Sequence, residues 1–253
     1  MTDFSKLLNP EQCAAATAGE GPILVLAAAG TGKTRTLVHR VAYLVEKGVP
    51  AERILLLTFT NKAAREMLDR ARQVVGPAVE TIWSGTFHSI CAKFLRRYAS
   101  LIGYQPGFQI LDEDDQKKLI GDIIKKVAKD PKDFIKKEIV AKMISEAANE
   151  QKPIQFIASR YLTKVAGVVP EEIQMVADKY KARKLELGAM DFDDLLVNGL
   201  RLLKEKDSVR EFLQEHFLYV LVDEYQDTNG IQAEFTDIIA AKHRNIMAVG
   251  DDF

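Results

Sequence analysis

Short runs of apolar residues alternate with segments of helical periodicity along much of the chain. Five of these runs are nearly continuous in valine, isoleucine and leucine, which is typical of parallel strands buried on both faces of a sheet. We expect these strands at Pro22–Ala27, Arg53–Phe59, Val79–Trp83, Phe217–Glu224 and Asn245–Gly250. The segments that follow the first three have apolar residues at helical spacing and are Thr34–Lys47, Lys62–Val75 and Phe87–Leu101. This alternation predicts an α/β fold with a parallel sheet.

The middle of the chain has a different pattern. From about Asp112 to Ala189 it is rich in lysine and glutamate, shows helical periodicity and contains no strand-like run. Helix starts are indicated by Asp112 and Asp191 as N-caps and by Pro170 at a first helical position. The stretch between the third and fourth strands is too long for a simple crossover connection. We therefore expect an all-helical subdomain inserted into the α/β core.

Composition narrows the class of protein only slightly. The 253 residues are 47% hydrophobic, which is enough for a substantial core, and no apolar run is long enough to span a bilayer. The first residues do not resemble a signal peptide, and Cys13 and Cys91 lack metal-ligand spacing. We therefore expect a cytoplasmic protein with reduced cysteines and no membrane partner.

The distribution of charge is more informative than the net charge of −1. Residues 1–111 carry 13 Lys and Arg against 8 Asp and Glu, whereas residues 191–253 carry 6 against 14. A local site for nucleic acid is therefore compatible with a nearly neutral chain. Ordinary variation of surface charge explains the same counts, so charge alone does not decide between the two.

A phosphate-binding loop is indicated between the first strand and the first helix. The segment AAAGTGKT, Ala27–Thr34, meets the pattern G-x-x-x-x-G-K-[ST] except at its first position. Glycines let the backbone N–H groups of such a loop surround a phosphate, and the helix N-terminus adds a favourable dipole. We expect Lys33 to reach the β- and γ-phosphates and the Thr34 hydroxyl to bind Mg²⁺. The other expected loop contacts are Ala28, Ala29, Gly30, Thr31 and Gly32.

A pair of acids follows the fourth apolar run, in YVLVDEYQDT. Asp223 at the tip of a strand is placed to hold Mg²⁺, and Glu224 directly after it can orient and deprotonate an attacking water. Two solvated acids at a strand end are common, but a phosphate loop in the same chain favours the functional interpretation. The pair also favours hydrolysis of a nucleotide over phosphoryl transfer.

Six motifs together resemble one family. The segments LNPEQ, AAAGTGKT, LTFTNKAAREM, GTFHS, MDFDDLL and VDEYQDTNGIQ are similar, in order and spacing, to the N-terminal half of UvrD/Rep/PcrA-type superfamily 1 DNA helicases. The resemblance implies a RecA-like P-loop core with an inserted helical subdomain, with ATP and Mg²⁺ as cofactors. It also implies translocation on single-stranded DNA in the 3′-to-5′ direction and unwinding at junctions between single and double strands.

The resemblance assigns further residues to the nucleotide. Gln12 matches a glutamine that recognises adenine, although Asn9, Pro10 and Gln12 also fit a helix capping box. Arg35 matches an arginine that packs near the adenine, and an ordinary surface arginine is an equally simple interpretation. Gln226, in the acidic motif, is implied to take part in catalysis together with Lys33 and the two acids.

The resemblance also places DNA at the ends of the second and third strands. Phe59 could stack on a base, although a core aromatic at a strand end would look the same. The remaining implied contacts to DNA are Thr58, Thr60, Asn61, Lys62, Thr86 and His88. A structural histidine is the alternative interpretation of His88.

The expected domains are a RecA-like core at residues 1–110 and 191–253, with the helical subdomain at 111–190. The chain ends inside AVGDDF, where the family continues with a γ-phosphate sensor and a second RecA-like domain. We therefore expect an N-terminal portion of a longer helicase, with weak ATPase activity by itself. The motor of a RecB/AddA-type helicase–nuclease and a nucleotide-gated DNA-binding module without unwinding activity remain open. A P-loop kinase or transporter ATPase would have no use for TFTNKAA or GTFHS.

Overall fold

The chain divides into two compact units. The computed structural model describes residues 2–28, 30–128, 134–162 and 168–251. The α/β unit comprises Met1–Ile90, Leu203–Thr228 and Gln232–Phe253, and the helical unit comprises Cys91–Leu202 and Asn229–Ile231. Each unit is considered by itself below.

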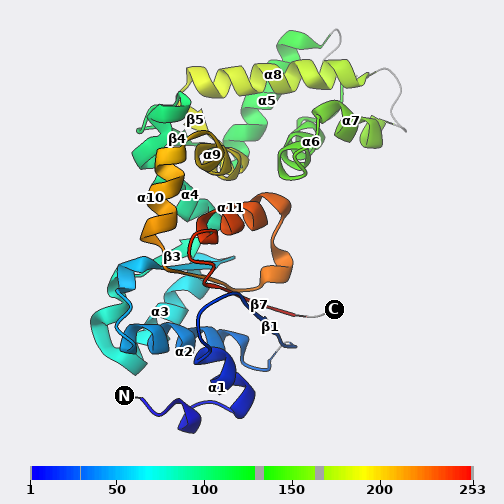
Figure 1. Ribbon diagram of the computed structural model, residues 1–253. Coiled ribbons are helices and arrows are strands. Elements are labelled where there is room, and N and C mark those ends of the chain that lie inside the picture. Colours follow the sequence, from blue (N-terminus) through cyan, green and yellow to red (C-terminus); the bar gives the residue numbers. More distant parts are fainter. Residues whose placement is uncertain (1, 29, 129–133, 163–167, 252–253) are drawn as a thin grey trace. The chain divides into compact units, whose positions relative to one another are not determined.

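A five-stranded parallel sheet forms the centre of the α/β unit (Figure 1). Its strands are β1 (Ile23–Leu26), β2 (Ile54–Thr58), β3 (Trp83–Thr86), β6 (Tyr219–Val222) and β7 (Ile246–Gly250). Their order across the sheet is β1-β7-β6-β2-β3. Because every neighbouring pair is parallel, the carboxyl ends of all five strands lie along the same edge. The predicted fold class, an α/β protein with a parallel sheet, is confirmed.

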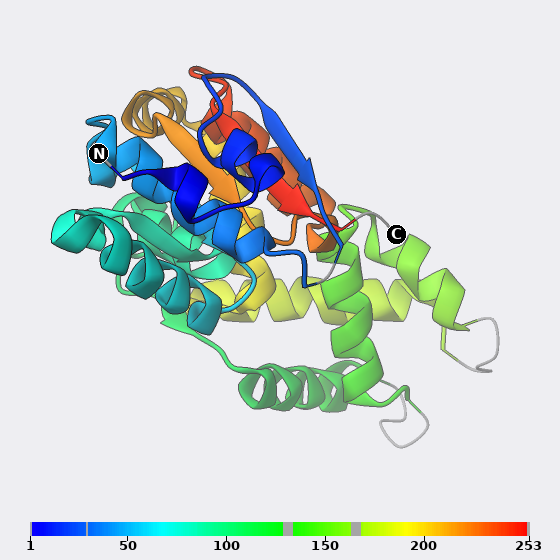
Figure 2. The same cartoon turned by 90° about the horizontal axis from the view of Figure 1, so that it is seen from below.

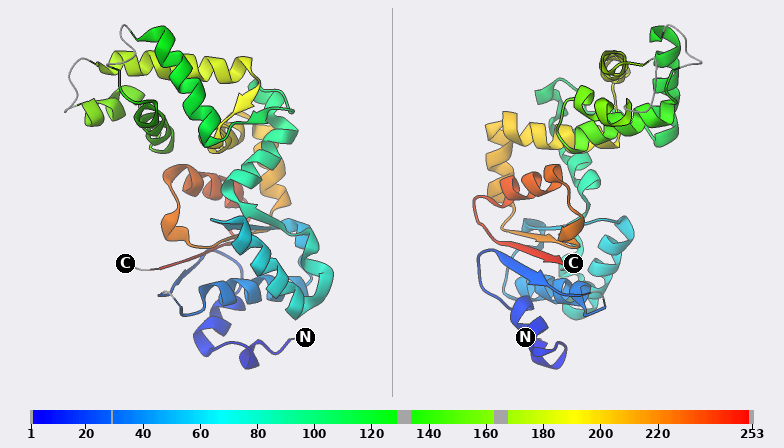
Figure 3. Two further views of the ribbon diagram at one scale, coloured as in Figure 1. Left: turned by 180° about the vertical axis from the view of Figure 1, so that it is seen from behind. Right: turned by 90° about the vertical axis from the view of Figure 1, so that its right-hand side faces the viewer.

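Helices cover both faces of this sheet. The helices of the unit are α1 (Pro10–Ala16), α2 (Lys33–Glu46), α3 (Asn61–Val75), α10 (Asp207–His216) and most of α11 (Gly230–Ala240). Short 3₁₀ helices occur at Phe4–Lys6, Ala51–Arg53, Gly76–Thr81 and Tyr225–Asp227. Apolar residues of α2 and α3 form one core with residues of β2, β6 and β7. Figure 2 views the unit from the side of α1, α2 and α3, and Figure 3 shows α11 on the opposite face of the sheet.

Two details of the predicted sheet were wrong. The segment Val79–Trp83 is largely the end of a 3₁₀ helix, Gly76–Thr81, and the third strand begins only at Trp83. Sequence periodicity does not reveal the 3₁₀ helix, because the apolar pattern of one 3₁₀ turn is indistinguishable from that of a short strand. In addition, β1 is not buried on both faces, since it lies at the edge of the sheet and leaves Leu24 and Leu26 64% and 58% exposed.

The helical unit contains six longer helices among its described residues. These are most of α4 (Phe87–Tyr98), α5 (Glu113–Val127), α6 (Lys137–Asn149), α7 (Ile154–Leu162), α8 (Pro170–Glu186) and most of α9 (Phe192–Glu205). A 3₁₀ helix occupies Ala99–Ile102. Apolar faces of α5, α6, α7 and α8 enclose the core, which includes Ile120, Met143, Ile157 and Tyr180. The sequence predicted no strand here, yet β4 (Gln109–Ile110) and β5 (Ala189–Met190) pair as a two-stranded parallel ladder.

The predicted helix starts in this unit are confirmed. The Asp112 carboxylate accepts the N–H of Asp115, and Pro170 occupies the first turn of α8. Before α9, Asp191 accepts the N–H of Asp194, and the N–H of Asp191 donates to the Asp194 carboxylate. Asp191 and Asp194 also flank the ammonium group of Lys184, which is buried in the unit.

The limits of the two units differ in detail from the expected domain limits, because most residues of α4 and α9 belong to the helical unit. The limits 1–110, 111–190 and 191–253 therefore stay a prediction. Among the described residues, no helix is both long and apolar enough to cross a membrane.

Candidate nucleotide site and nucleic-acid interface

The edge where the five parallel strands end gathers most of the predicted site. The phosphate loop follows β1, Asp223 and Glu224 follow β6, and Thr58 and Thr86 are paired terminal residues of β2 and β3. The carboxyl edge of an open α/β sheet is where ligands bind in such folds. Parallel topology therefore brings together segments that are up to about two hundred residues apart in the sequence.

The phosphate loop has the backbone conformation that its glycines predict. Gly30 and Gly32 have φ angles of +80° and +94°, which side chains rarely tolerate. The Thr31 N–H donates to the Ala28 carbonyl at 3.2 Å, and Gly32 is the N-cap of α2. The exposed turn therefore presents the N-terminus of α2. The prediction for Ala29 lies outside the described residues.

The Gln12 side chain lies against this loop. Its Nε2 donates to the Thr31 carbonyl at 2.8 Å, and its Oε1 accepts the Asn9 N–H at 3.3 Å in a capping box. A Cβ atom on Gly32 would lie 2.5 Å from Gln12 Nε2, so the glycine is needed for this close approach. The capping-box interpretation of Gln12 is therefore confirmed, and its contact with adenine stays a prediction. The exposed Arg35 donates to the Leu7 carbonyl just before this cap.

Lys33 is buried and its ammonium group contacts two carboxylates. It forms ion pairs with Glu224, at 3.3 Å, and with Asp251, which directly follows β7. Gln226 joins these acids, because its Nε2 donates to Glu224 at 2.7 Å and its Oε1 accepts the Asp251 N–H at 3.1 Å. The sequence reasoning did not select Asp251. The sequence feature that could have identified Asp251 is the one that identified Asp223, namely an acid directly after a buried strand.

Asp223 and Glu224 differ in their surroundings. Asp223 is buried, and its Oδ1 has no hydrogen-bond partner among the described residues. Burial and the adjacent Glu224 carboxylate raise the pKa of Asp223 to about 6. Glu224 is half-exposed and has a φ angle of +49°, an uncommon conformation for a residue with a side chain. Such backbone outliers occur preferentially at functional sites.

The second predicted group of residues lies at the ends of β2 and β3. Phe59 is half-buried and its ring meets that of Phe87 edge to face, with centroids 6.1 Å apart. Thr60 caps α3 by accepting the Ala63 N–H at 3.1 Å, and Asn61 and Lys62 are exposed on the first turn of that helix. This leaves a polar helix N-terminus beside a half-exposed aromatic ring.

The threonines of this edge are largely engaged within the chain. Thr58 is fully buried, and its hydroxyl donates to the Thr60 carbonyl at 2.9 Å. The Thr86 hydroxyl accepts the Ser89 N–H at 3.2 Å at the start of α4, and His88 in the same turn is half-buried. The side chain of Thr58 is therefore suited to supporting Thr60 and does not face solvent.

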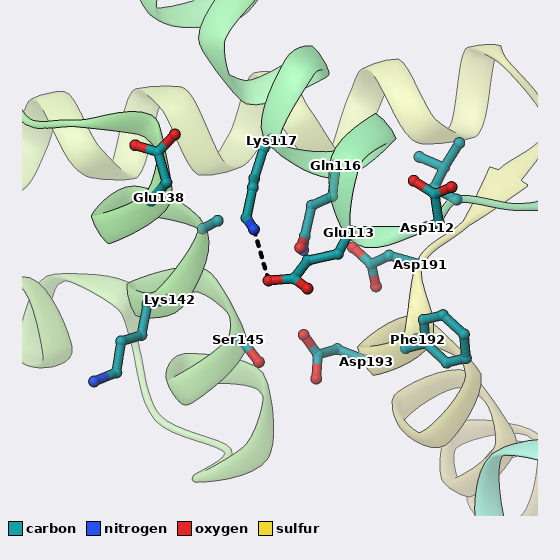
Figure 4. Close-up of a pocket in the computed structure, with 12 residues that line it drawn as sticks. Asp112, Glu113, Gln116, Lys117, Glu138, Lys142, Ser145, Asp191, Phe192 and Asp193 are labelled. Atoms are coloured by element: carbon teal, nitrogen blue, oxygen red, sulfur yellow. Dashed lines mark ion pairs between the residues drawn. The ribbon is translucent and has the colours of Figure 1, made fainter.

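The helical unit contains a separate cavity of about 570 Å³ between α5, α6 and the start of α9 (Figure 4). Acidic side chains line it, and Glu113 pairs with Lys117 at 2.7 Å. No group of three or more His, Cys, Asp or Glu side chains in the described part of the chain could hold a metal ion. The sequence reasoning did not anticipate this cavity.

Comparison with known proteins places the chain in a class that fits this geometry. Residues 8–252 match the family described as the UvrD/REP helicase N-terminal domain, so the chain belongs to that family. The resemblance inferred from the six motifs is thereby confirmed.

The particular relatives are proteins named ATP-dependent DNA helicase PcrA. The chain is 42% identical over 251 residues to the one from Staphylococcus aureus, covering 96% of this chain and 33% of the relative. It is 43% identical over 248 residues to the one from Bacillus subtilis, covering 96% and 32%. The chain thus spans about a third of the length of these relatives.

Proposed function

We propose that this chain is the ATP-binding part of a DNA motor that translocates on single-stranded DNA and unwinds duplexes. The observation that carries the proposal is the shared strand-end edge, where a phosphate loop and an acid pair lie in the same unit as a polar, partly aromatic surface. A kinase or a simple nucleotide hydrolase would need the first two features and not the third. The names of the relatives support ATP as the nucleotide and DNA as the track.

The phosphate loop supplies the contacts to the nucleotide. Gly30, Gly32 and the first turn of α2 offer N–H groups to the phosphates, and Lys33 supplies a positive charge. Ala27, Ala28, Ala29 and Thr31 complete the loop. Gln12 is positioned to exchange its bond to Thr31 for one to adenine, because an amide can both donate and accept. Arg35, two residues beyond Lys33, is assigned to the adenine end of the nucleotide, as is Gln12.

The residues present fit a magnesium ion. Asp223 offers a buried carboxylate oxygen without a hydrogen-bond partner among the described residues, and Thr34 offers a hydroxyl on the first turn of α2. Oxygen donors of this kind are what Mg²⁺ prefers. When bound, the ion would neutralise phosphate charge. Asp223 and Thr34 are therefore the residues assigned to hold it.

Hydrolysis needs an oriented water, and Glu224 is the group assigned to activate it. Its carboxylate is half-exposed and is held in place by Lys33 and Gln226. A base fixed in this way can accept a proton from water without first losing side-chain freedom. Gln226 is thus a positioning residue for Glu224, and Lys33 passes from Glu224 to the phosphates when the triphosphate binds.

The DNA is assigned to the ends of β2 and β3. Phe59 can stack on a base with its exposed part, while Thr60, Asn61 and Lys62 offer polar groups to the phosphate backbone. Thr86 and His88 extend this surface along the next strand, and Thr58 supports it from inside. We further propose 3′-to-5′ movement, action at junctions of single- and double-stranded DNA, and completion of the ATP site by a second RecA-like domain. On this view, the chain by itself hydrolyses ATP slowly or not at all.

Substitution of Lys33 by alanine tests the phosphate site. We expect the affinity for a fluorescent ATP analogue to fall by at least about 100-fold, because the buried positive charge is lost. Thermal unfolding should change little, since both partner acids reach solvent. Lys47→Ala, at the exposed end of the same helix, is the matched control and should bind like the unmodified chain. Unchanged affinity in Lys33→Ala would contradict the phosphate-loop assignment.

The DNA surface is tested with labelled single-stranded DNA, with and without a non-hydrolysable ATP analogue. Phe59→Ala should weaken binding by about 5- to 150-fold, the range for loss of one stacked base. Phe156→Ala, an exposed aromatic of the helical unit, serves as the control. Nucleotide-dependent DNA binding without any ATPase activity would support a nucleotide-gated binding module. Steady-state ATPase stimulated manyfold by single-stranded DNA would refute the expected weak activity of the chain alone.

A further inference from the structure

The Lys33 ammonium group belongs to a closed ring of four residues at the ends of three neighbouring strands. Lys33 follows β1, Asp251 follows β7, and Glu224 and Gln226 follow β6. Lys33 pairs with both acids, Gln226 donates to Glu224, and the Asp251 N–H donates back to Gln226. The buried cation is therefore neutralised by the chain's own carboxylates.

Asp251 is held in this ring at two points. Its backbone N–H is fixed by the Gln226 amide at 3.1 Å, and its carboxylate contacts Lys33. Gly250 allows Gln226 to come this close, since a Cβ atom there would lie 2.6 Å from Gln226 Oε1. The side chain of Asp251 is nevertheless 28% exposed, so its carboxylate can rotate into water. Because its backbone is anchored and its side chain is partly exposed, Asp251 can release Lys33 without unfolding β7.

On the basis of the proposed function, we propose that Asp251 makes the site discriminate between nucleoside triphosphate and diphosphate. In a loop of this kind the lysine reaches the β- and γ-phosphates. Lys33 already contacts two carboxylates, so a γ-phosphate would be a third and more highly charged anion at one ammonium group, where like charges repel strongly in a partly buried site. A triphosphate must displace Asp251 from Lys33. A diphosphate lacks the γ-phosphate and leaves the Asp251 pair in place.

The displacement of Asp251 also affects Glu224. Glu224 loses Lys33 in the same event and keeps Gln226 as its partner. The Glu224 carboxylate, which is assigned to activate water, is therefore released from Lys33 only when the triphosphate is present.

The test compares the unmodified chain with Asp251→Asn, which has the same shape and keeps the backbone N–H. Affinities for a fluorescent non-hydrolysable triphosphate and for the corresponding diphosphate are measured with and without Mg²⁺. We expect Asp251→Asn to bind triphosphate about tenfold more tightly, and diphosphate no more than about threefold more tightly. Asp251→Glu, which keeps the charge, should restore the original ratio of the two affinities.

Asp227→Asn is the matched control, because it removes one exposed acid from the β6 loop without touching Lys33. It should leave the ratio unchanged, and thermal unfolding verifies that each variant is folded. An equal gain for both nucleotides in Asp251→Asn, or no gain, would overturn the inference while leaving the phosphate site intact. Weaker triphosphate binding only in the presence of Mg²⁺ would overturn it in favour of a metal-binding role. Absence of nucleotide binding in the unmodified chain and in Asp227→Asn would refute the phosphate site itself.

Discussion

The α/β unit and the helical unit each bury a lysine between two carboxylates. Lys33 is 8% exposed and contacts Glu224 and Asp251, whereas Lys184 is 5% exposed and contacts Asp191 at 2.6 Å and Asp194 at 2.5 Å. The residue types are the same in the two clusters. Their surroundings differ, and the difference separates a site from a structural ion pair.

The acids around Lys184 are more enclosed, since Asp191 is 4% exposed and Asp194 is 19% exposed. Asp191 accepts hydrogen bonds from Lys184, from the Tyr180 hydroxyl at 2.8 Å and from the Asp194 N–H at 2.8 Å. Burial acts to lower the pKa of Lys184, but the charges of Asp194 and Asp191 outweigh it and raise that pKa. Both acids are fixed by helix capping as well as by charge, because Asp191 and Asp194 accept each other's backbone N–H groups.

The acids around Lys33 are less enclosed. The side chains of Glu224 and Asp251 are 36% and 28% exposed, against 4% for Asp191. The neighbouring Asp223 keeps an oxygen without a hydrogen-bond partner among the described residues. A buried cation whose partners can leave is suited to ligand exchange, while one whose partners cannot leave is suited to stability. Three predictions test this contrast.

Lys184→Met should have the largest effect on stability. It leaves the buried Asp191 and the largely covered Asp194 without their cation, which costs roughly 3–5 kcal/mol of unfolding free energy. Lys179→Met, an exposed lysine on the same helix, is the control and should change stability by less than about 0.5 kcal/mol. Urea unfolding should be followed by far-UV circular dichroism and by the fluorescence of Trp83, the chain's single tryptophan, which lies in β3.

Trp83 fluorescence reports on the α/β unit, whereas circular dichroism includes the helices of the helical unit, so the two signals distinguish the two units. We expect the circular-dichroism transition of Lys184→Met to move to lower urea more than the Trp83 transition, because Lys184 lies in the helical unit. Equal stability of Lys184→Met and Lys179→Met would show that the buried cluster is not a stabilising feature and would remove the contrast with Lys33.

The pH dependence of stability should reveal the burial of the Asp223 carboxyl, which raises its pKa. Its folded pKa of about 6 lies above the ordinary value of 3.8, so the folded state binds more protons than the unfolded state between these values. The free energy of unfolding should therefore fall as pH rises from about 4 to 7, by on the order of 2 kcal/mol. Asp223→Asn should lack this contribution. Parallel profiles for Asp223→Asn and the unmodified chain would contradict the raised pKa.

Tyr180→Phe should have the smallest effect. It removes one hydrogen bond to a buried carboxylate that keeps its other partners, which costs about 1–2 kcal/mol. Combining it with Asp191→Asn in a double-mutant cycle isolates the pair, because the bond to a neutral amide is weaker than one to a carboxylate. Strictly additive costs in the cycle would show that Tyr180 contributes by packing alone.

Local patterns predicted much of the fold correctly. The Asp112, Asp191 and Pro170 helix starts were confirmed because capping depends on residues three positions apart. The misplaced third strand and the unpredicted β4–β5 ladder have the opposite cause. Two paired residues leave no periodicity, and a 3₁₀ turn resembles a strand end in its apolar content. The exposed face of β1 depends on its position in the sheet, which its own sequence does not encode.

The candidate site shows the same division. The sequence by itself determined the α/β class from the alternation of apolar runs and helical segments. It also determined the phosphate loop with its positive-φ glycines, the acid pair and the family, because each of these depends on short contiguous motifs. Only the tertiary structure decided which carboxylates surround Lys33, and that Asp251 is one of them. Three strands that are distant in the sequence meet at one edge of the sheet. The burial of Lys33, and the greater exposure of its partner acids compared with those of Lys184, arise only when these strands meet.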